Sequence, residues 1–167
     1  MVEIRLATPE DAARMLKIQK EVIQEGEFLL STIEEFTQTV EGQRTWIEAK
    51  QQNDLEVIFV AEVDQQVVGW IVFQSHGRVR VQHSGVMGFM VQHDVRGQGI
   101  GQQLLMALLE WAEANPIIEK VSLGVFSTNE RAIRMYQKFG FVEEGRKVRE
   151  IKLNNLYVDD VLMYKFV

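Results

Sequence analysis

The chain has 167 residues, of which 46% are hydrophobic and 25% charged, a composition typical of one globular domain and not of a disordered chain. A net charge of −6 argues against broad contact with nucleic-acid backbone, and the absence of cysteine excludes disulfides, thiolate metal sites and a cysteine nucleophile. The sequence contains no run long enough to span a bilayer and no signal-like segment at its start, so we expect a cytoplasmic protein with a single domain over residues 1–167, no membrane contact and no metal.

The first third of the sequence predicts one strand followed by two helices. "EIRLA" alternates like a strand, and "TPED" then begins a helix over about 9–25 with Thr8 as its cap. "TIEE" matches a capping box between Thr32 and Glu35, which predicts a second helix to about residue 51. Four apolar residues would form the buried side of this second helix: Ile33, Phe36, Val40 and Ile47.

The middle of the sequence predicts three strands and a third helix. The strand-like runs are "LEVIFVAEV", "QVVGWIVFQSH" and "SGVMGFMVQ", and the first two are joined by a hairpin turn around Asp64 and Gln65. After a glycine-rich segment, apolar residues at helical spacing predict a helix that ends near Asn115 and Pro116.

The last third predicts a strand, a helix and a final pair of strands. "IEKVSLGVF" is typical of a strand, and "STNERAIRMYQKFG" of a helix with a capping box at Ser127 and Glu130 and a left-handed cap at Gly140. The remaining residues predict two strands that turn at Asn154 and Asn155. The order β-α-α-β-β-β-α-β-α-β-β favours an α/β (α+β) fold with helices on both faces of one sheet.

The segment "VRGQGIG" (residues 95–101) lies where a strand meets a helix. Glycines can adopt positive φ, so their N–H groups can point at one anion, and the helix start adds free N–H groups. The spacing matches neither a Walker loop, since Gln102 follows the last glycine, nor a Rossmann loop, whose third glycine comes one residue later. A pyrophosphate site is the functional interpretation, and a tight strand-to-helix turn is the structural one.

A second segment, "FSTNERAIRMYQKFGF", has a structural interpretation of its own, apart from any resemblance. From helical periodicity alone, Asn129 is a first-turn residue and Tyr136 a packed aromatic whose hydroxyl is satisfied within the protein.

Taken together, the two segments resemble the signatures of the GCN5-related N-acetyltransferase (GNAT) superfamily. Residues 96–101 match Arg/Gln-x-x-Gly-x-Gly/Ala. Asn-x-x-Ala-x-x-x-Tyr-x-x-x-Gly-Phe is matched by Asn129, Ala132, Tyr136, Gly140 and Phe141. The resemblance implies the acyl-CoA N-acyltransferase fold, with a mixed, mostly antiparallel sheet of about seven strands and helices on both faces. It also implies acetyl-CoA as the acetyl donor.

The resemblance implies roles for particular residues. The fourth strand would separate from the fifth to admit the pantetheine arm, Asn129 would hydrogen-bond that arm, and Tyr136 would protonate the departing thiolate as general acid. A backbone N–H near Met90 would polarise the thioester carbonyl. The residues expected to bind the cofactor, besides Asn129 and Tyr136, are Met90, Val91, Arg96, Gly97, Gln98, Gly99, Ile100, Gly101 and Gln102.

The general base is less defined, because the fourth strand lacks the glutamate that many relatives carry. His83 is the preferred candidate, since histidine titrates near neutral pH. His93 and Glu27 are the alternatives, and all three are also explained as solvated strand ends or a loop charge.

The acceptor side is expected in the connection between the first two helices. There Glu25 and Glu27 would attract a cationic amine, while Phe28 and Leu29 would pack on its carbon skeleton, although a plain helix end explains them equally well. The resulting hypothesis is direct acetyl transfer from acetyl-CoA to the primary amine of a small molecule, such as a polyamine or an amino acid. The alternatives are acetylation of a protein N-terminus or lysine and, more distantly, a non-catalytic acyl-CoA-binding module.

The resemblance also bears on the oligomeric state. Relatives are often homodimers, and "LYVDDVLMYKFV" is the segment that would pair.

Overall fold

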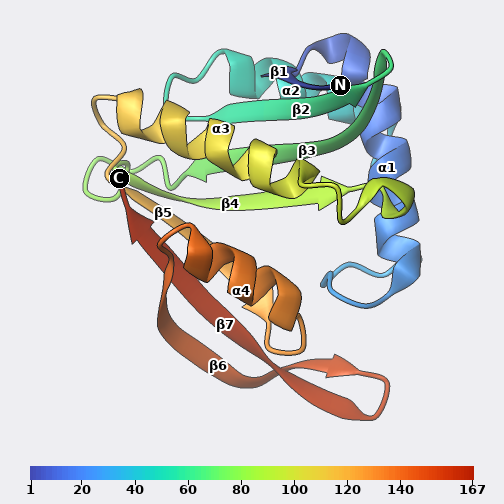
Figure 1. The fold of residues 1–167 in the computed structure, drawn as a ribbon, viewed down its shortest axis with the longest axis vertical. Helices are drawn as coiled ribbons and strands as arrows, with labels where there is room; N and C mark the ends of the chain where they lie inside the picture. The colour runs from blue at the N-terminus through green and yellow to red at the C-terminus, as the bar shows by residue number, and fades with distance from the viewer.

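A mixed sheet of seven strands, in the order β1-β2-β3-β4-β5-β7-β6, forms the centre of the computed structural model, which describes residues 1–167 (Figure 1). All neighbouring strands are antiparallel except β4 and β5. The elements in chain order are β1 (Val2–Leu6), a 3-10 turn (Pro9–Asp11), α1 (Ala12–Glu25), α2 (Val40–Gln51), β2 (Val57–Val63), β3 (Gln66–Ser75), β4 (Ser84–Val91), a 3-10 turn (His93–Val95), α3 (Ile100–Ala114), β5 (Lys120–Phe126), α4 (Glu130–Lys138), β6 (Val142–Leu153) and β7 (Leu156–Phe166). The predicted element order and fold class are confirmed.

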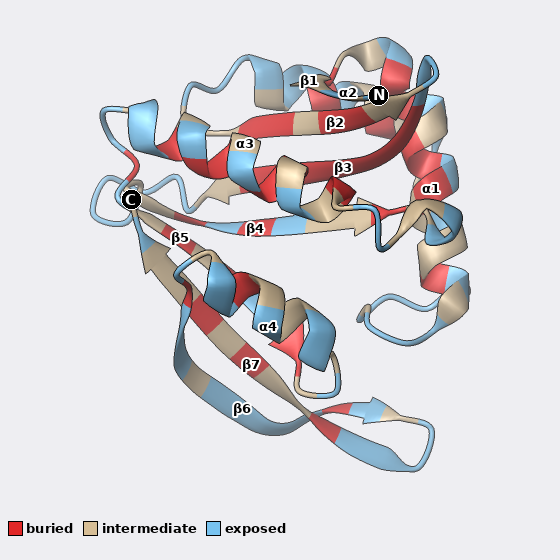
Figure 2. Cartoon of the chain, in the orientation of Figure 1, coloured by how far each residue is buried: buried red, intermediate tan, exposed pale blue.

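Helices cover both faces of the sheet, but they do so unequally (Figures 1 and 2). On one face, α3 and α4 pack over the strands and form a core of 21 buried residues. On the other face, α1 and α2 pack on β2, β3 and the end of β4, with a core of 10 buried residues. The second face of β5, β6 and β7 carries only a cluster of three buried residues, Phe126, Ile151 and Val158.

The predicted turns between antiparallel strands are confirmed by the backbone. Asp64 and Gln65 both have positive φ (49° and 63°), as a two-residue hairpin turn that matches the strand twist requires. Asn154 also has positive φ (55°), and Leu153 pairs with Leu156 across that turn. No helix in the structure is both long enough and apolar enough to cross a membrane.

The predicted start of the second helix was wrong. The Thr32 N–H does donate to the Glu35 carboxylate (3.1 Å), but only a turn follows, and α2 begins at Val40. Thr39 is the true cap, because its hydroxyl accepts a hydrogen bond from the Gly42 N–H (3.0 Å). Of the predicted buried side, Ile47 is buried, Phe36 is half-buried, and Ile33 and Val40 are exposed. Without a surface to pack against, the segment before Thr39 has little to stabilise a helix.

The predicted capping box of the last helix was also wrong. α4 begins at Glu130, and the Asn129 side chain caps it by accepting a hydrogen bond from the Ala132 N–H (3.3 Å). The Ser127 hydroxyl instead accepts a hydrogen bond from the Asp159 N–H (3.1 Å) on β7. Gly140 follows the helix with φ of 88°, the left-handed conformation predicted for it.

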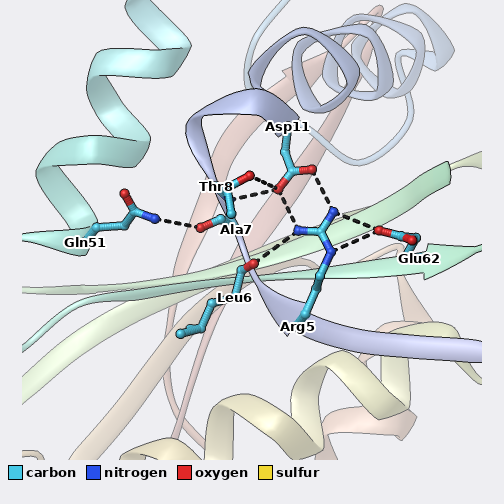
Figure 3. Close-up of polar contacts among 7 residues, drawn as sticks. All are labelled: Arg5, Leu6, Ala7, Thr8, Asp11, Gln51 and Glu62. Carbon is cyan, nitrogen blue, oxygen red and sulfur yellow. Dashed lines mark hydrogen bonds and ion pairs between the residues drawn. The ribbon is translucent and has the colours of Figure 1, made fainter. Parts of the chain in front are cut away.

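An ion-pair network joins β1, β2 and the start of α1 (Figure 3). The Arg5 guanidinium donates to both oxygens of Asp11 (2.8 Å each) and to Glu62 (2.8 and 2.9 Å). The Asp11 carboxylate also accepts a hydrogen bond from the Thr8 N–H (2.8 Å). Because the strands and the helix start share these bonds, the network fixes the edge strand to the rest of the sheet.

Candidate active site

The sheet opens between β4 and β5. These parallel strands are paired only from Ser84 to Val86 on β4 and from Lys120 to Ser122 on β5. The five remaining residues of β4 and the four of β5 diverge, so the backbone edges that face each other there have no strand partner. This opening was predicted from the resemblance, and the structure confirms it.

Two hydrogen bonds at the ends of the β3–β4 ladder establish which residues of β4 face the opening. The His76 N–H donates to the Ser84 carbonyl (3.1 Å), and the Gln92 N–H donates to the Val68 carbonyl (2.8 Å). Successive residues of a strand point their backbone groups to opposite sides. Even-numbered residues of β4 therefore bond to β3, and odd-numbered residues face β5.

This alternation changes the backbone donors expected from the sequence. Met90 lies opposite Trp70 and its backbone is directed to β3, so its N–H is not free for a ligand. Phe89 and Val91 direct their N–H groups into the opening instead. The Met90 side chain lies on the α1 face, where it packs against the smaller helix-covered core.

The glycine loop leads from β4 into α3 in the conformation that its sequence predicts. Gly97 and Gly99 have φ of 83° and 80°, which only glycine adopts without strain, and the space beside Gly99 is open. α3 begins at Ile100, and no side chain caps it. Its first intrahelical bond is from the Gln103 N–H to the Gly99 carbonyl (3.1 Å), so the N–H groups of the first turn are available to an anion.

Gly101 also has a packing role. A Cβ at this position would lie 3.1 Å from the Phe89 ring, so glycine allows α3 to approach β4 closely.

Arg96 is directed away from the loop that it begins. Its guanidinium makes a two-fold ion pair with Glu25 at the end of α1 (2.6 and 2.8 Å), and its Nε donates to the Val91 carbonyl (2.9 Å). Its observed contacts therefore hold α1 and β4 together, and its predicted contact with pyrophosphate stays a prediction.

A different arginine, which the sequence reasoning missed, lies beside the glycine loop. Arg131 of α4 has its Nη2 3.6 Å from where a Cβ on Gly97 would be. It forms no ion pair within the chain, whereas Arg134, one turn later, pairs with Glu130 (3.2 Å). The loop thus has free N–H groups on one side and an unpaired guanidinium on the other, which suits a phosphate.

Tyr136 lies next to the opening, on the α3 and α4 face. Its ring packs edge-on against Phe89 of β4 (centroids 6.2 Å apart) and against Phe141 (5.8 Å). Burial raises the pKa of the Tyr136 hydroxyl well above its ordinary value, so the group is protonated at neutral pH. Its hydroxyl makes no hydrogen bond within the chain, which leaves it as a donor for a ligand in the opening.

Asn129 uses its side-chain oxygen to cap α4. The amide nitrogen of the same side chain makes no hydrogen bond within the chain, which leaves it as a donor for the predicted contact with the cofactor arm.

A cavity of about 650 Å³ lies on the opposite face of the sheet, where β4 and β5 diverge. α1 and the loop after it cover one side of the cavity, and β6 and β7 border the other. The lining residues are Gln19, Ile23, Phe28, Leu29, Leu30, Ser31, His76, Ser84, Val86, Met87, Met90, Lys120, Ser122, Leu123, Gly124, Phe126, Glu144, Asp160 and Leu162. Met87 and Leu123 belong to the core of the other face, so the cavity reaches into the opening.

The predicted acceptor residues are only partly in this cavity. Phe28 and Leu29 line it, whereas Glu27 is exposed in the same loop and Glu25 is paired with Arg96 outside the cavity. The three candidates for the general base, His83, His93 and Glu27, do not line it, and their catalytic role stays a prediction. Its titratable groups are His76, Lys120, Glu144 and Asp160, which sequence reasoning did not select.

A sequence model of the acetyltransferase (GNAT) family matches residues 26–141, and the chain belongs to this family. The fold agrees: the crystal structure of a GNAT-family acetyltransferase from Streptococcus pneumoniae superposes with a TM-score of 0.95 over all of both chains, at 27% identity. The structure of yncA from Salmonella typhimurium with its cofactor acetyl-CoA has a TM-score of 0.89 over 99% of this chain and 94% of that one, at 20% identity.

Three curated relatives are N-acetyltransferases by name. The SPbeta prophage-derived uncharacterized N-acetyltransferase YokL of Bacillus subtilis (strain 168) is 24% identical over 95% of this chain and 85% of its own length. The L-amino acid N-acetyltransferase AaaT of Escherichia coli (strain K12) is 30% identical over 62% of this chain and 64% of its own length. The spermidine N(1)-acetyltransferase of Vibrio cholerae is 29% identical over 50% of this chain and 49% of its own length. The chain is thus an N-acetyltransferase, and its named relatives act on different kinds of amine.

Proposed function

We propose that this enzyme transfers the acetyl group of acetyl-CoA directly to the primary amine of a small molecule. The observation that carries the proposal is the cavity at the β4–β5 opening, which is covered by α1 and residues 28–31 on one side and bordered by β7 on the other. A cavity of about 650 Å³ is within the size range of small-molecule sites, which supports a small acceptor over a protein one.

The donor would bind from the other face of the sheet. Phosphates would be held by the N–H groups of Gly99 and the first turn of α3, and by the guanidinium of Arg131. The pantetheine arm would run along β4, where Phe89 and Val91 offer free N–H groups, and the Asn129 amide would donate to it. Acetyl-CoA held by these groups would have its thioester between the cavity and Tyr136.

The chemistry follows from these positions. Acetyl-CoA supplies a thioester, whose carbonyl carbon forms a bond with the amine nitrogen while the bond to sulfur breaks. An N–H in the opening, that of Phe89 or Val91, stabilises the negative charge on the carbonyl oxygen. The Tyr136 hydroxyl gives its proton to the departing thiolate, and the proton that the amine nitrogen loses returns through water to the tyrosine. Direct attack is favoured because the chain has no cysteine to form an acyl-enzyme.

The proposal is tested by following thiol release from acetyl-CoA in the presence of amines, polyamines, amino acids and peptides. A Tyr136→Phe variant is expected to lose about a hundredfold in kcat, because a positioned general acid contributes at least this much. Tyr157→Phe is the matched control, since Tyr157 is half-exposed on the β6–β7 hairpin and its change should leave kcat unaltered.

The donor site is tested separately with acetyl-CoA binding. A Gly99→Glu variant should bind no acetyl-CoA, since it fills the open space beside the loop with a negative side chain. Arg131→Gln should weaken binding about tenfold, the effect of one charge-assisted hydrogen bond, and Arg134→Gln should not. Turnover of peptides but of no small amine would favour the protein-acceptor alternative. Tight acetyl-CoA binding without turnover of any acceptor would favour a binding module.

A further inference from the structure

Asp160 of β7 lies across the backbone of Gly124 on the neighbouring strand. A Cβ on Gly124 would be 2.9 Å from Asp160 Oδ1 and 3.6 Å from Oδ2. Any other residue at position 124 would therefore displace the carboxylate. Both residues line the cavity, and Gly124 is two residues beyond the last β4–β5 pair, so the carboxylate lies in the open part of the split.

The Asp160 carboxylate has few partners for a group that is largely buried. Its side chain is 19% exposed, it accepts no hydrogen bond within the chain, and its nearest cation is Lys147 Nζ at 3.9 Å on the exposed strand β6. The adjacent Asp159 accepts a hydrogen bond from the Arg149 N–H (2.8 Å). A shielded carboxylate is ordinarily supplied with donors. The donors that Asp160 lacks are expected from a ligand.

The other charges of the cavity do not favour an anion. Lys120 forms an ion pair with Glu144 (2.5 Å), and its ammonium also lies over the Tyr164 ring (4.8 Å from the centroid). His76 is at the exposed rim. The fixed cation is therefore neutralised, and Asp160 is the charge inside the cavity that remains without a hydrogen bond. The apolar walls, among them Phe28 and Leu162, suit a hydrocarbon body.

The reacting amine must be neutral to attack a thioester, and a carboxylate in contact with it would stabilise the protonated form instead. The group that Asp160 holds is accordingly a cation that does not react. We propose that Asp160, placed on Gly124, binds the second ammonium of a diamine or polyamine acceptor, and that it selects such acceptors over amino acids. This inference rests on the proposed function, whose acceptor it specifies.

The test compares acceptors that differ only at the end remote from the reacting amine. A series of linear diamines is matched by the monoamines of the same carbon chain and by the amino acids in which a carboxylate replaces the second ammonium. For the wild-type enzyme, kcat/KM is expected to be about tenfold higher for the best diamine than for its monoamine. The amino acids should be the poorest acceptors, because their carboxylate would meet Asp160.

Asp160→Asn retains the shape and removes the charge. It is expected to raise KM for the diamine about tenfold, to the value for the monoamine, while kcat for the diamine stays the same. The kinetic constants for the monoamine should not change. Asp159→Asn is the control, since its neighbouring side chain is engaged with Arg149 and does not line the cavity.

Two results would overturn the inference. One is a wild-type enzyme that does not prefer diamines to monoamines, a comparison that needs no variant. The other is an Asp160→Asn enzyme that loses activity equally with all three kinds of acceptor. If monoamines are acetylated without a preference for diamines, only this inference fails. If no small amine is acetylated at all, the proposed function fails with it.

Discussion

The two halves of the sheet, β1–β4 and β5–β7, are built differently. Strands β2 to β4 are covered on both faces, by α3 on one and by α1 and α2 on the other. Strands β5 and β7 share the larger core, but the second face of β5, β6 and β7 carries only three buried residues, and β6 is exposed along most of its length (Figure 2). The half without a second layer provides one side of the cavity, the side that contains Asp160.

The difference shows how the same sheet provides both stability and a site. Where helices cover both faces, buried side chains fill most of the space between the helices and the sheet. Where the second layer is absent and β4 and β5 part, the chain leaves polar groups such as Asp160 and free backbone N–H groups beside a cavity. The predictions below test this division, from the largest expected effect to the smallest.

The largest expected effect is the loss of stability when either of two strand isoleucines is replaced by alanine. Ile71 of β3 is fully buried in the larger core, and Ile151 of β6 is in the three-residue cluster. Ile71→Ala should lower the free energy of unfolding by about 4 kcal/mol, and Ile151→Ala by about 2 kcal/mol, because the thinner layer leaves a smaller cavity. Urea unfolding of both variants measures this. Equal losses would mean that the second half is as well packed as the first.

A second prediction concerns the ion-pair network of Arg5, Asp11 and Glu62, which lies at the edge of the first half of the sheet. Asp11→Asn removes the charge that Arg5 binds and should lower the free energy of unfolding by about 2 kcal/mol at neutral pH. The control is Asp54→Asn, since Asp54 is exposed and its carboxylate has no partner. If the two variants are equally stable, the network contributes nothing to the stability of this edge.

The same network has a predictable pH dependence. Burial alone would raise the pKa of Asp11, but the hydrogen bonds from Arg5 and from the Thr8 N–H outweigh it, so the pKa is lower than in the unfolded chain. The stabilisation is therefore complete above the unfolded-state pKa, about 4, and is lost as the pH falls through the lower folded-state value. Unfolding measured from neutral pH to about pH 2 should show the wild type approaching Asp11→Asn. A difference that stays constant over that range would contradict this assignment.

The smallest expected effect concerns the start of α2. Thr39→Ala should cost about 1 kcal/mol, the contribution of an N-cap, and Thr32→Ala much less. Thermal unfolding distinguishes the two positions. A larger loss for Thr32 would mean that the helix extends over residues 32–39.

The elements and the donor loop could be predicted from the sequence because they depend on local signals. The two hairpin turns, the cap at Gly140 and the positive φ of Gly97 and Gly99 are all properties of a few neighbouring residues. The second helix was misplaced because Thr32 and Thr39 both carry a capping signal, and only the packing of the following residues decides between them.

The acceptor side could not be predicted in the same way. Asp160, Glu144 and Lys120 are brought together by the order of strands β5, β7 and β6, which no local pattern encodes. Arg96 matched the signature, but its partner Glu25 is 71 residues away. Arg131 lies within the second signature, yet its place beside Gly97 depends on how α4 packs.

The ion pair between Arg96 and Glu25 has a consequence for how the two sides of the site behave. Glu25 is the last residue of α1, directly before the loop that covers the cavity, and Arg96 begins the glycine loop on the other side of the sheet. The pair passes around the end of β4 and is fixed to it through the Val91 carbonyl. The loop that covers the cavity and the glycine loop are therefore anchored at the same ion pair, so loss of either charge would release an attachment of both.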